Sequence, residues 1–337
     1  MLKNDWSIAL ALFREDGTPI GQLPVDVDWE PAQQWVRHIA LCRGANVRAR
    51  GAAEMRPIWR NATGPALGGF RVAIETDGQP GEVWCDFPST YFRGLAAALS
   101  GPLVESGHLV SGEVFRYIAL AHPLPRNGSK SGSAAVVVHE VTPAPAFRAS
   151  SFDSFRRQAV AIGEAAPDEV PAFAPRRVLD EITTLTRQAC PLETGGALIG
   201  HLDRDPEAPT VFAVVTAQVP ACHTQASAVR LAFTSDTWSD MRRTLEERAQ
   251  HEVMLGWWHS HPIREWCRQK DCAETHHDQC LLGQDCFSEH DRAVHRTVFP
   301  GAHCVALVAN DVSEADVRFS VYGWSLGMLR PRALFVM

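Results

Sequence analysis

Two histidines that stand two residues apart follow a strongly apolar run. Residues 253–258 (VMLGWW) are typical of a buried strand, and His259 and His261 come at its end. Because side chains alternate between the two faces of a strand, both imidazoles point to the same side. Two imidazoles at this spacing can converge on one metal ion. The alternative is a pair of hydrogen-bonded polar groups at a strand end.

A serine and an aspartate three residues apart open a predicted helix further along the chain. Ser288 and Asp291 precede residues 292–294, which read as a first helical turn, and residues i and i+3 share one helix face. Taken alone, the pair favours a simple helix cap. Taken with the two histidines, Asp291 completes three protein ligands and leaves a fourth tetrahedral position open for water. That pattern is typical of catalytic zinc.

An acidic residue upstream is the candidate for the base that such a site needs. Glu193 lies between a predicted helix (176–188) and a glycine-rich predicted strand (195–202), where a carboxylate can project from a sheet edge into a cleft. By itself, Glu193 favours an ordinary surface carboxylate. Considered together, the glutamate, the histidine pair and the Ser-x-x-Asp pair favour a metal-dependent site.

These residues, in this order, resemble the motif of the JAMM (JAB/MPN+) metalloprotease family. The flanking segments ETGG (193–196) and GWWHSHP (256–262) match that family closely, and the resemblance covers about residues 175–325. It implies an α/β domain, a mixed sheet flanked by helices, that hydrolyses an amide or isopeptide bond with zinc. In this family, Glu193 would accept the proton of the activated water and pass it to the leaving amine. Ser288 would donate a hydrogen bond to the developing oxyanion.

One departure from the family pattern is large. In the family, seven residues usually separate the second histidine from the serine, whereas 26 residues (262–287) separate His261 from Ser288 here. The insertion contains four cysteines and two histidines, namely Cys267, Cys272, Cys280, Cys286, His276 and His277. We expect the four thiolates, or three of them with His276 or His277, to hold a second, structural zinc that orders a loop without regular structure. Unpaired thiols and a disulfide are the alternatives.

Length and composition are those of a soluble chain with two domains. The 337 residues carry a formal charge of -7, with 45% hydrophobic and 21% charged residues. This balance argues against a nucleic-acid partner, because phosphate contacts need a basic surface. No apolar run approaches the ~20 residues that span a bilayer. The short run at 7–13 reads as a strand rather than a signal peptide, so we expect a cytoplasmic protein with no membrane partner.

Composition shifts divide the chain into two predicted domains. Residues 1–150 indicate an α+β domain of unrecognised type, with strands at 6–13, 35–41, 70–74 and 115–120 and a helix at 91–103. Residues 151–175 include a proline-rich segment and are expected to be a linker. Residues 176–330 are the expected JAMM-like domain, with the cysteine-rich insertion at 262–287.

The resemblance implies an isopeptidase that removes or processes a ubiquitin-like modifier, with that modifier or its conjugates as partner. The composition, rich in Ala, Arg and Gly and poor in Lys, favours a bacterial source. Bacterial members of the family often accompany ubiquitin-like conjugation genes, including ones in antiviral defence. The alternatives are a non-catalytic or autoinhibited scaffold and a hydrolase of sulfur-carrier or small-molecule conjugates.

Overall fold

The chain forms two compact units, Met1–Ala144 and Pro145–Met337. The structure, a computed structural model, describes residues 2–47, 53–62, 64–77, 82–124, 146–166, 168–222, 224–226, 231–272 and 287–337. No helix in these ranges has the length and apolar character needed to cross a membrane.

The first unit is an α+β domain with two sheets. One sheet has the order β3-β2-β8, from β2 (Trp6–Arg14), β3 (Pro19–Val25) and β8 (Phe115–Pro123). The other contains β1 (Leu2–Lys3), β4 (Asn46–Val47), β5 (Ala53–Trp59), β6 (Leu67–Asp77) and β7 (Glu82–Pro88). Helix α1 (Glu30–Cys42) contacts β6 and β7, and the short helices η1 (Ser89–Phe92), α2 (Arg93–Ala98) and α3 (Ser100–Glu105) follow.

Most elements predicted for the first unit are present, but one is wrong. The strand predicted at 35–41 lies inside helix α1, whose first turn holds Pro31 and whose buried face includes Trp35, Val36 and Ala40. Ala32, Val36 and Ala40 are all buried and follow one another at intervals of four residues, which fits one helix face. The apolar run 35–41 was too short for its composition alone to distinguish a strand from a helix.

The second unit is the expected α/β domain. Its described residues form a ten-stranded mixed sheet of order β10-β20-β11-β13-β12-β16-β17-β18-β19, with β9 paired to β12. The strands are β9 (Phe147–Ala149), β10 (Val160–Ile162), β11 (Ala172–Ala174), β12 (Gly195–Arg204), β13 (Val211–Pro220), β16 (Val253–His261), β17 (Val305–Asp311), β18 (Val317–Ser325), β19 (Met328–Pro331) and β20 (Leu334–Val336). Strands β14 (Thr224–Ala226) and β15 (Leu231–Phe233) form a separate pair.

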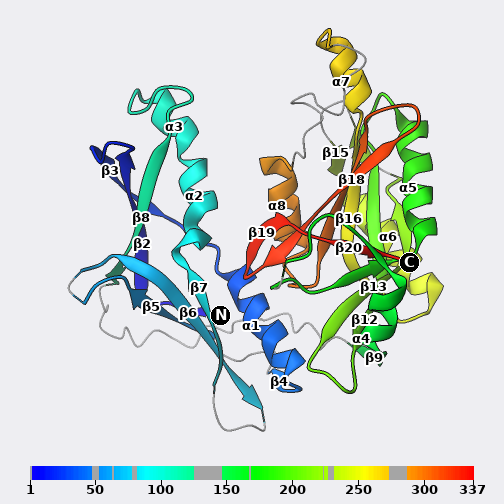
Figure 1. Cartoon of the computed structure of the whole chain (residues 1–337), viewed down its shortest axis with the longest axis horizontal. Helices are drawn as coiled ribbons and strands as arrows, with labels where there is room; N and C mark the ends of the chain where they lie inside the picture. Colours follow the sequence, from blue (N-terminus) through cyan, green and yellow to red (C-terminus); the bar gives the residue numbers. More distant parts are fainter. Residues whose placement is uncertain are drawn as a thin grey trace. The chain divides into compact units, whose positions relative to one another are not determined.

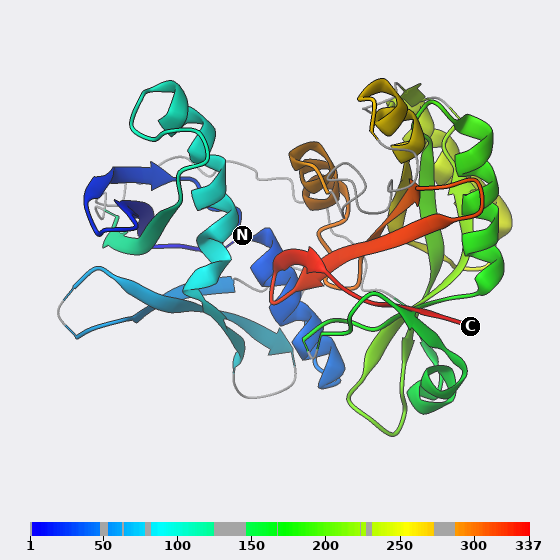
Figure 2. The ribbon, with the colours of Figure 1, turned by 45° about the horizontal axis from the view of Figure 1, so that its top comes forward.

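Helices cover both faces of this sheet. The helices are α4 (Phe152–Gln158), α5 (Arg176–Ala189), α6 (Ser235–Arg248), α7 (Ile263–Gln269) and α8 (Glu289–Val298). Along β12, Leu198 packs in the core that includes α5, whereas the neighbouring Ala197 packs with Met241 of α6. This alternation is the two-residue period of a strand that is buried on both faces. Helices α5 and α8 lie on opposite sides of β16 to β18 (Figure 1, Figure 2).

The expected linker at 151–175 belongs to the second unit instead. It supplies α4, β10 and β11, and β11 lies between β13 and β20 in the sheet. Phe173 of β11 is fully buried against Phe212 and Phe335. Prolines on both sides of this three-residue strand gave the segment the composition of a linker. The unit also begins before residue 151 and extends beyond residue 330, through β9 and β20.

Strand β16 lies between two partners at the centre of the sheet. It runs antiparallel to β12 and parallel to β17, with Gly256 paired to Val305 of β17. A Cβ atom placed on Gly256 would lie 1.9 Å from the backbone oxygen of Val305. The close approach of the two strands therefore requires a glycine three residues before His259.

We predict that Gly256→Ala destabilises the second unit by about 1–3 kcal/mol or more, because the added methyl group forces β16 away from β17. Chemical denaturation followed by circular dichroism measures this change. An unfolding midpoint equal to that of the unsubstituted protein would show that the two strands are not packed this closely.

Candidate metal centre

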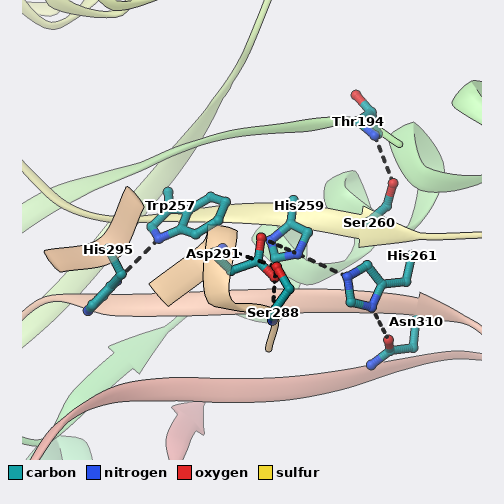
Figure 3. A network of polar contacts seen from close by, with 9 residues as sticks. All are labelled: Thr194, Trp257, His259, Ser260, His261, Ser288, Asp291, His295 and Asn310. Carbon is teal, nitrogen blue, oxygen red and sulfur yellow. Dashed lines mark hydrogen bonds and ion pairs between the residues drawn. The ribbon is translucent and has the colours of Figure 1, made fainter. Parts of the chain in front are cut away.

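Three side chains from two elements converge at the end of β16. The Nε2 atoms of His259 and His261 are 3.1 Å apart, and Nε2 of His259 is 3.6 Å from Oδ1 of Asp291 on α8. One ligand atom of each residue lies within 4.8 Å of the others, and all three residues are buried. Figure 3 shows the two imidazoles and the carboxylate turned toward one another. The sequence-predicted ligands are therefore brought together.

These separations fit a tetrahedral zinc site. Two nitrogens bound to one zinc at about 2.05 Å lie about 3.3 Å apart in tetrahedral geometry. The distance between the two histidine nitrogens is close to that value. The donor set of two imidazoles and one carboxylate is also one that zinc takes in catalytic sites. His290, next to Asp291, is exposed and is not part of the cluster.

Burial keeps both imidazoles in the neutral form that binds metals. Burial lowers the pKa of His259 to about 3, and it also lowers the pKa of His261, with His259 as the next cause. Nδ1 of His261 lies 3.2 Å from Oδ1 of Asn310, whose amide nitrogen donates to Oγ of Ser320. An amide oxygen can only accept, so the proton of His261 sits on Nδ1 and the lone pair of Nε2 faces the cluster.

A helix cap orients the aspartate. The backbone N–H and the hydroxyl of Ser288 both donate to Oδ2 of Asp291, at 2.8 Å and 2.7 Å, while the N–H of Asp291 donates to the Ser288 hydroxyl. This reciprocal capping box begins helix α8. It holds Oδ2 away from the histidines and leaves Oδ1 facing His259. The cap that the sequence favoured and the ligand role of Asp291 are therefore compatible.

Glu193 lies beside the cluster. Strand pairing places Gly195 opposite His259. The N–H of Ser260 donates to the carbonyl of Thr194, and the N–H of Thr194 donates to the Ser260 hydroxyl, which keeps the next residues side by side. Because side chains alternate, Glu193 is on the same face as the histidines. The residue is buried, with 6% of its surface exposed. Burial raises the pKa of its carboxyl to about 8, and the negative charge of Asp291 adds to the rise.

Aromatic rings surround the three ligands. Trp257 stacks on His259 with ring centroids 4.7 Å apart, and Phe287 lies 6.3 Å from the same imidazole. Trp266 lies 5.0 Å from the ring of His261. Such apolar walls lower the local dielectric and strengthen every charge interaction within the cluster.

The insertion begins with regular structure, which corrects the expectation of a loop without any. Residues 263–269 form α7, and Arg264 of this helix makes two hydrogen bonds to the buried Asp311 at the end of β17. Cys267 is buried in a small cluster with Ile263 and Val312, and Cys272 packs against that cluster. The other predicted ligands of the second zinc, Cys280 and Cys286, lie outside the described residues, as do His276 and His277.

Sequence reasoning missed the residues that support the ligands from other elements. Asn310 is the penultimate residue of the apolar strand β17 and contacts Nδ1 of His261, and His295 of α8 accepts a hydrogen bond from Trp257. A polar residue directly after a buried run was a signal for Asn310. His295 is four residues after Asp291 and shares its helix face, which was a signal for its position but not for its partner.

We predict that Glu193→Gln stabilises the metal-free protein more as the pH rises. The pKa of Glu193 is raised from 4.5 to about 8 in the folded chain, so the folded state holds a proton that the unfolded state has lost between these values. Stability conferred by this proton declines as the pH rises through that window. Thermal melts in chelator at pH about 5 and about 8.5 measure the effect. If the melting temperatures of variant and parent differed by the same amount at both pH values, the prediction would be wrong.

Comparison with known proteins finds a family match within the second unit. Residues 175–265 match the family of prokaryotic homologs of the JAB domain, a range that includes Glu193, His259 and His261 and ends inside the insertion. No curated protein matches the chain. The solution structure of protein DSY2949 from Desulfitobacterium hafniense is similar over 49% of this chain and 92% of its own, at 18% identity and a TM-score of 0.34.

The family match covers the helix α5, the strand β12 and the strand β16 that carry or support the histidine pair. Helix α8 then adds the aspartate from beyond the insertion. The second unit of this protein therefore contains a prokaryotic JAB domain.

Proposed function

We propose that this protein is a zinc-dependent hydrolase that cuts an amide or isopeptide bond. The observation that carries the proposal is the buried cluster of His259, His261 and Asp291, which has metal-binding separations and a buried carboxyl group, Glu193, beside it. A cluster of this composition without a cation would leave the charge of Asp291 poorly compensated in an apolar surrounding.

Zinc held by these three residues would supply Lewis-acid polarisation of a carbonyl group and a lowered pKa for water. Glu193 is suited to move a proton between water and a leaving amine, because its raised pKa of about 8 shows that it holds a proton easily near neutral pH. A cation beside it would shift that pKa downward and favour the basic form.

Ser288 is exposed at the start of α8, where its hydroxyl can meet a bound substrate. Its hydroxyl hydrogen is directed at Oδ2 of Asp291. To stabilise an oxyanion, the hydroxyl would have to exchange this bond for one to the substrate. We therefore propose two roles for Ser288: it orients Asp291 in the resting protein and donates to the oxyanion during the reaction.

The proposed substrate is a ubiquitin-like modifier joined to an amine, or a precursor of such a modifier, in a bacterial conjugation system that can serve antiviral defence. This assignment rests on the family resemblance and on the JAB domain match. Sulfur-carrier or small-molecule conjugates are the second candidate substrates. A purely non-catalytic scaffold is disfavoured, because the three ligands, Glu193 and Ser288 are all present around one point.

Further parts of the proposal concern the rest of the chain. We propose a second zinc at the cysteines of the insertion, supported by Cys267 and Cys272 lying at one cluster. We also propose that the protein acts in the cytoplasm without a membrane or nucleic-acid partner. The net charge of -7 supports the proposed absence of a nucleic-acid partner.

We predict that Glu193→Gln abolishes cleavage of a ubiquitin-like fusion while it leaves zinc binding intact. Loss of the group that moves the proton lowers the rate by at least about 100-fold. Gel-based cleavage assays with a panel of fusions and zinc titration of the same samples measure the two properties. Glu289→Gln is the matched control, because Glu289 is an exposed carboxylate on α8 outside the cluster. Cleavage by the Glu193→Gln protein at the parent rate would reject the assigned role.

A further inference from the structure

The metal ligands come from two elements that the chain joins only through the long insertion. The histidines end β16, the aspartate lies in the first turn of α8, and residues 262–287 separate them. A connection of this length does not by itself fix the distance between strand and helix. Packing of α8 against β16 and against β18, which supplies Trp324, must therefore set the separation of the ligands.

One buried hydrogen bond joins these two elements beside the ligands. The indole N–H of Trp257 on β16 donates to Nδ1 of His295 on α8 over 3.2 Å, as Figure 3 shows. His295 is fully buried and Trp257 nearly so. In the described part of the chain, Nε2 of His295 has no hydrogen-bond partner, so the bond to Trp257 is the polar contact that orients the ring.

Each partner in this bond is coupled directly to a ligand on its own element. Trp257 stacks on His259 with an interplanar angle of 14°. His295 follows Asp291 by one helical turn and lies on the same face of α8. A displacement of α8 along or away from β16 would break the indole–imidazole bond and separate Asp291 from His259 together.

We propose that Trp257 and His295 are positioning residues that hold the strand-borne histidines and the helix-borne aspartate at metal-binding distance before an ion arrives. The pair lies outside the ligand set, and its action is to reduce the rearrangement that metal binding requires. This inference rests on the proposed metal site and does not depend on the substrate.

The pair can be distinguished from an ordinary buried hydrogen bond by what its removal changes. A bond that serves stability alone lowers the free energy of unfolding and leaves the metal affinity of the folded protein unchanged. A bond that positions the ligands lowers that affinity as well. The losses of zinc affinity caused by the two substitutions should then be non-additive, because each substitution removes the same hydrogen bond.

The experiment measures zinc affinity by competition with a chromophoric chelator in the full chain. The variants are Trp257→Phe, which keeps an aromatic ring but removes the donor, His295→Leu, which removes the acceptor, and their combination. His295→Asn is the rescue variant, since its amide oxygen can take the place of Nδ1. Trp258→Phe is the matched control, because this neighbouring tryptophan packs in the core on the other face and its indole N–H has no hydrogen-bond partner in the described part of the chain.

We expect each single substitution to weaken zinc binding by about tenfold, and the double substitution to weaken it by about the same factor. His295→Asn and Trp258→Phe should bind zinc within about threefold of the parent, even where Trp258→Phe lowers the melting temperature. Circular dichroism confirms which variants are folded.

Equal affinities of the Trp257→Phe and Trp258→Phe proteins, or an additive loss in the double variant, would overturn the positioning role while the metal site stands. Failure of the parent protein to bind zinc would instead refute the metal site, and the inference with it.

Discussion

The second unit buries four ionisable side chains together in a largely apolar surrounding. His259, His261, Asp291 and Glu193 are each less than 8% exposed, and aromatic rings surround them. Groups of this kind are costly to bury unless they are paired or bind a cation. Burial keeps the two imidazoles neutral and raises the pKa of the Glu193 carboxyl to about 8. A single cation would relieve the remaining electrostatic strain.

The sheet supplies the precision that such a cluster needs. Strand β16 is held on both sides, and the register with β12 places Gly195 opposite His259, which brings Glu193 to the histidine face. The parallel strand β17 contributes Asn310 behind His261. The aspartate alone comes from a helix, and the capping box fixes its side chain relative to that helix. Central strands and a helix N-terminus are rigid supports for a site built from few residues.

The local parts of this arrangement could be predicted from the sequence, and the non-local parts could not. Strand alternation gave the shared direction of His259 and His261, and helix spacing gave the pairing of Ser288 with Asp291. The supports from Asn310 and His295 depend on which strands and helices are neighbours, and the local pattern carries no such information. Two predictions from composition were wrong. A short apolar run was interpreted as a strand although it lies in helix α1, and prolines on both sides of the buried strand β11 were interpreted as a linker.

The proposed reaction requires that two histidines from a strand and one aspartate from a helix bind a single zinc ion with one position left open. X-ray diffraction at the zinc absorption edge, from crystals grown with zinc, tests it most directly. We expect an anomalous peak about 2.0–2.1 Å from Nε2 of His259 and of His261 and about 2.0–2.2 Å from Oδ1 of Asp291. The absence of a peak at this position, or a fourth protein ligand that closes the site, would contradict it.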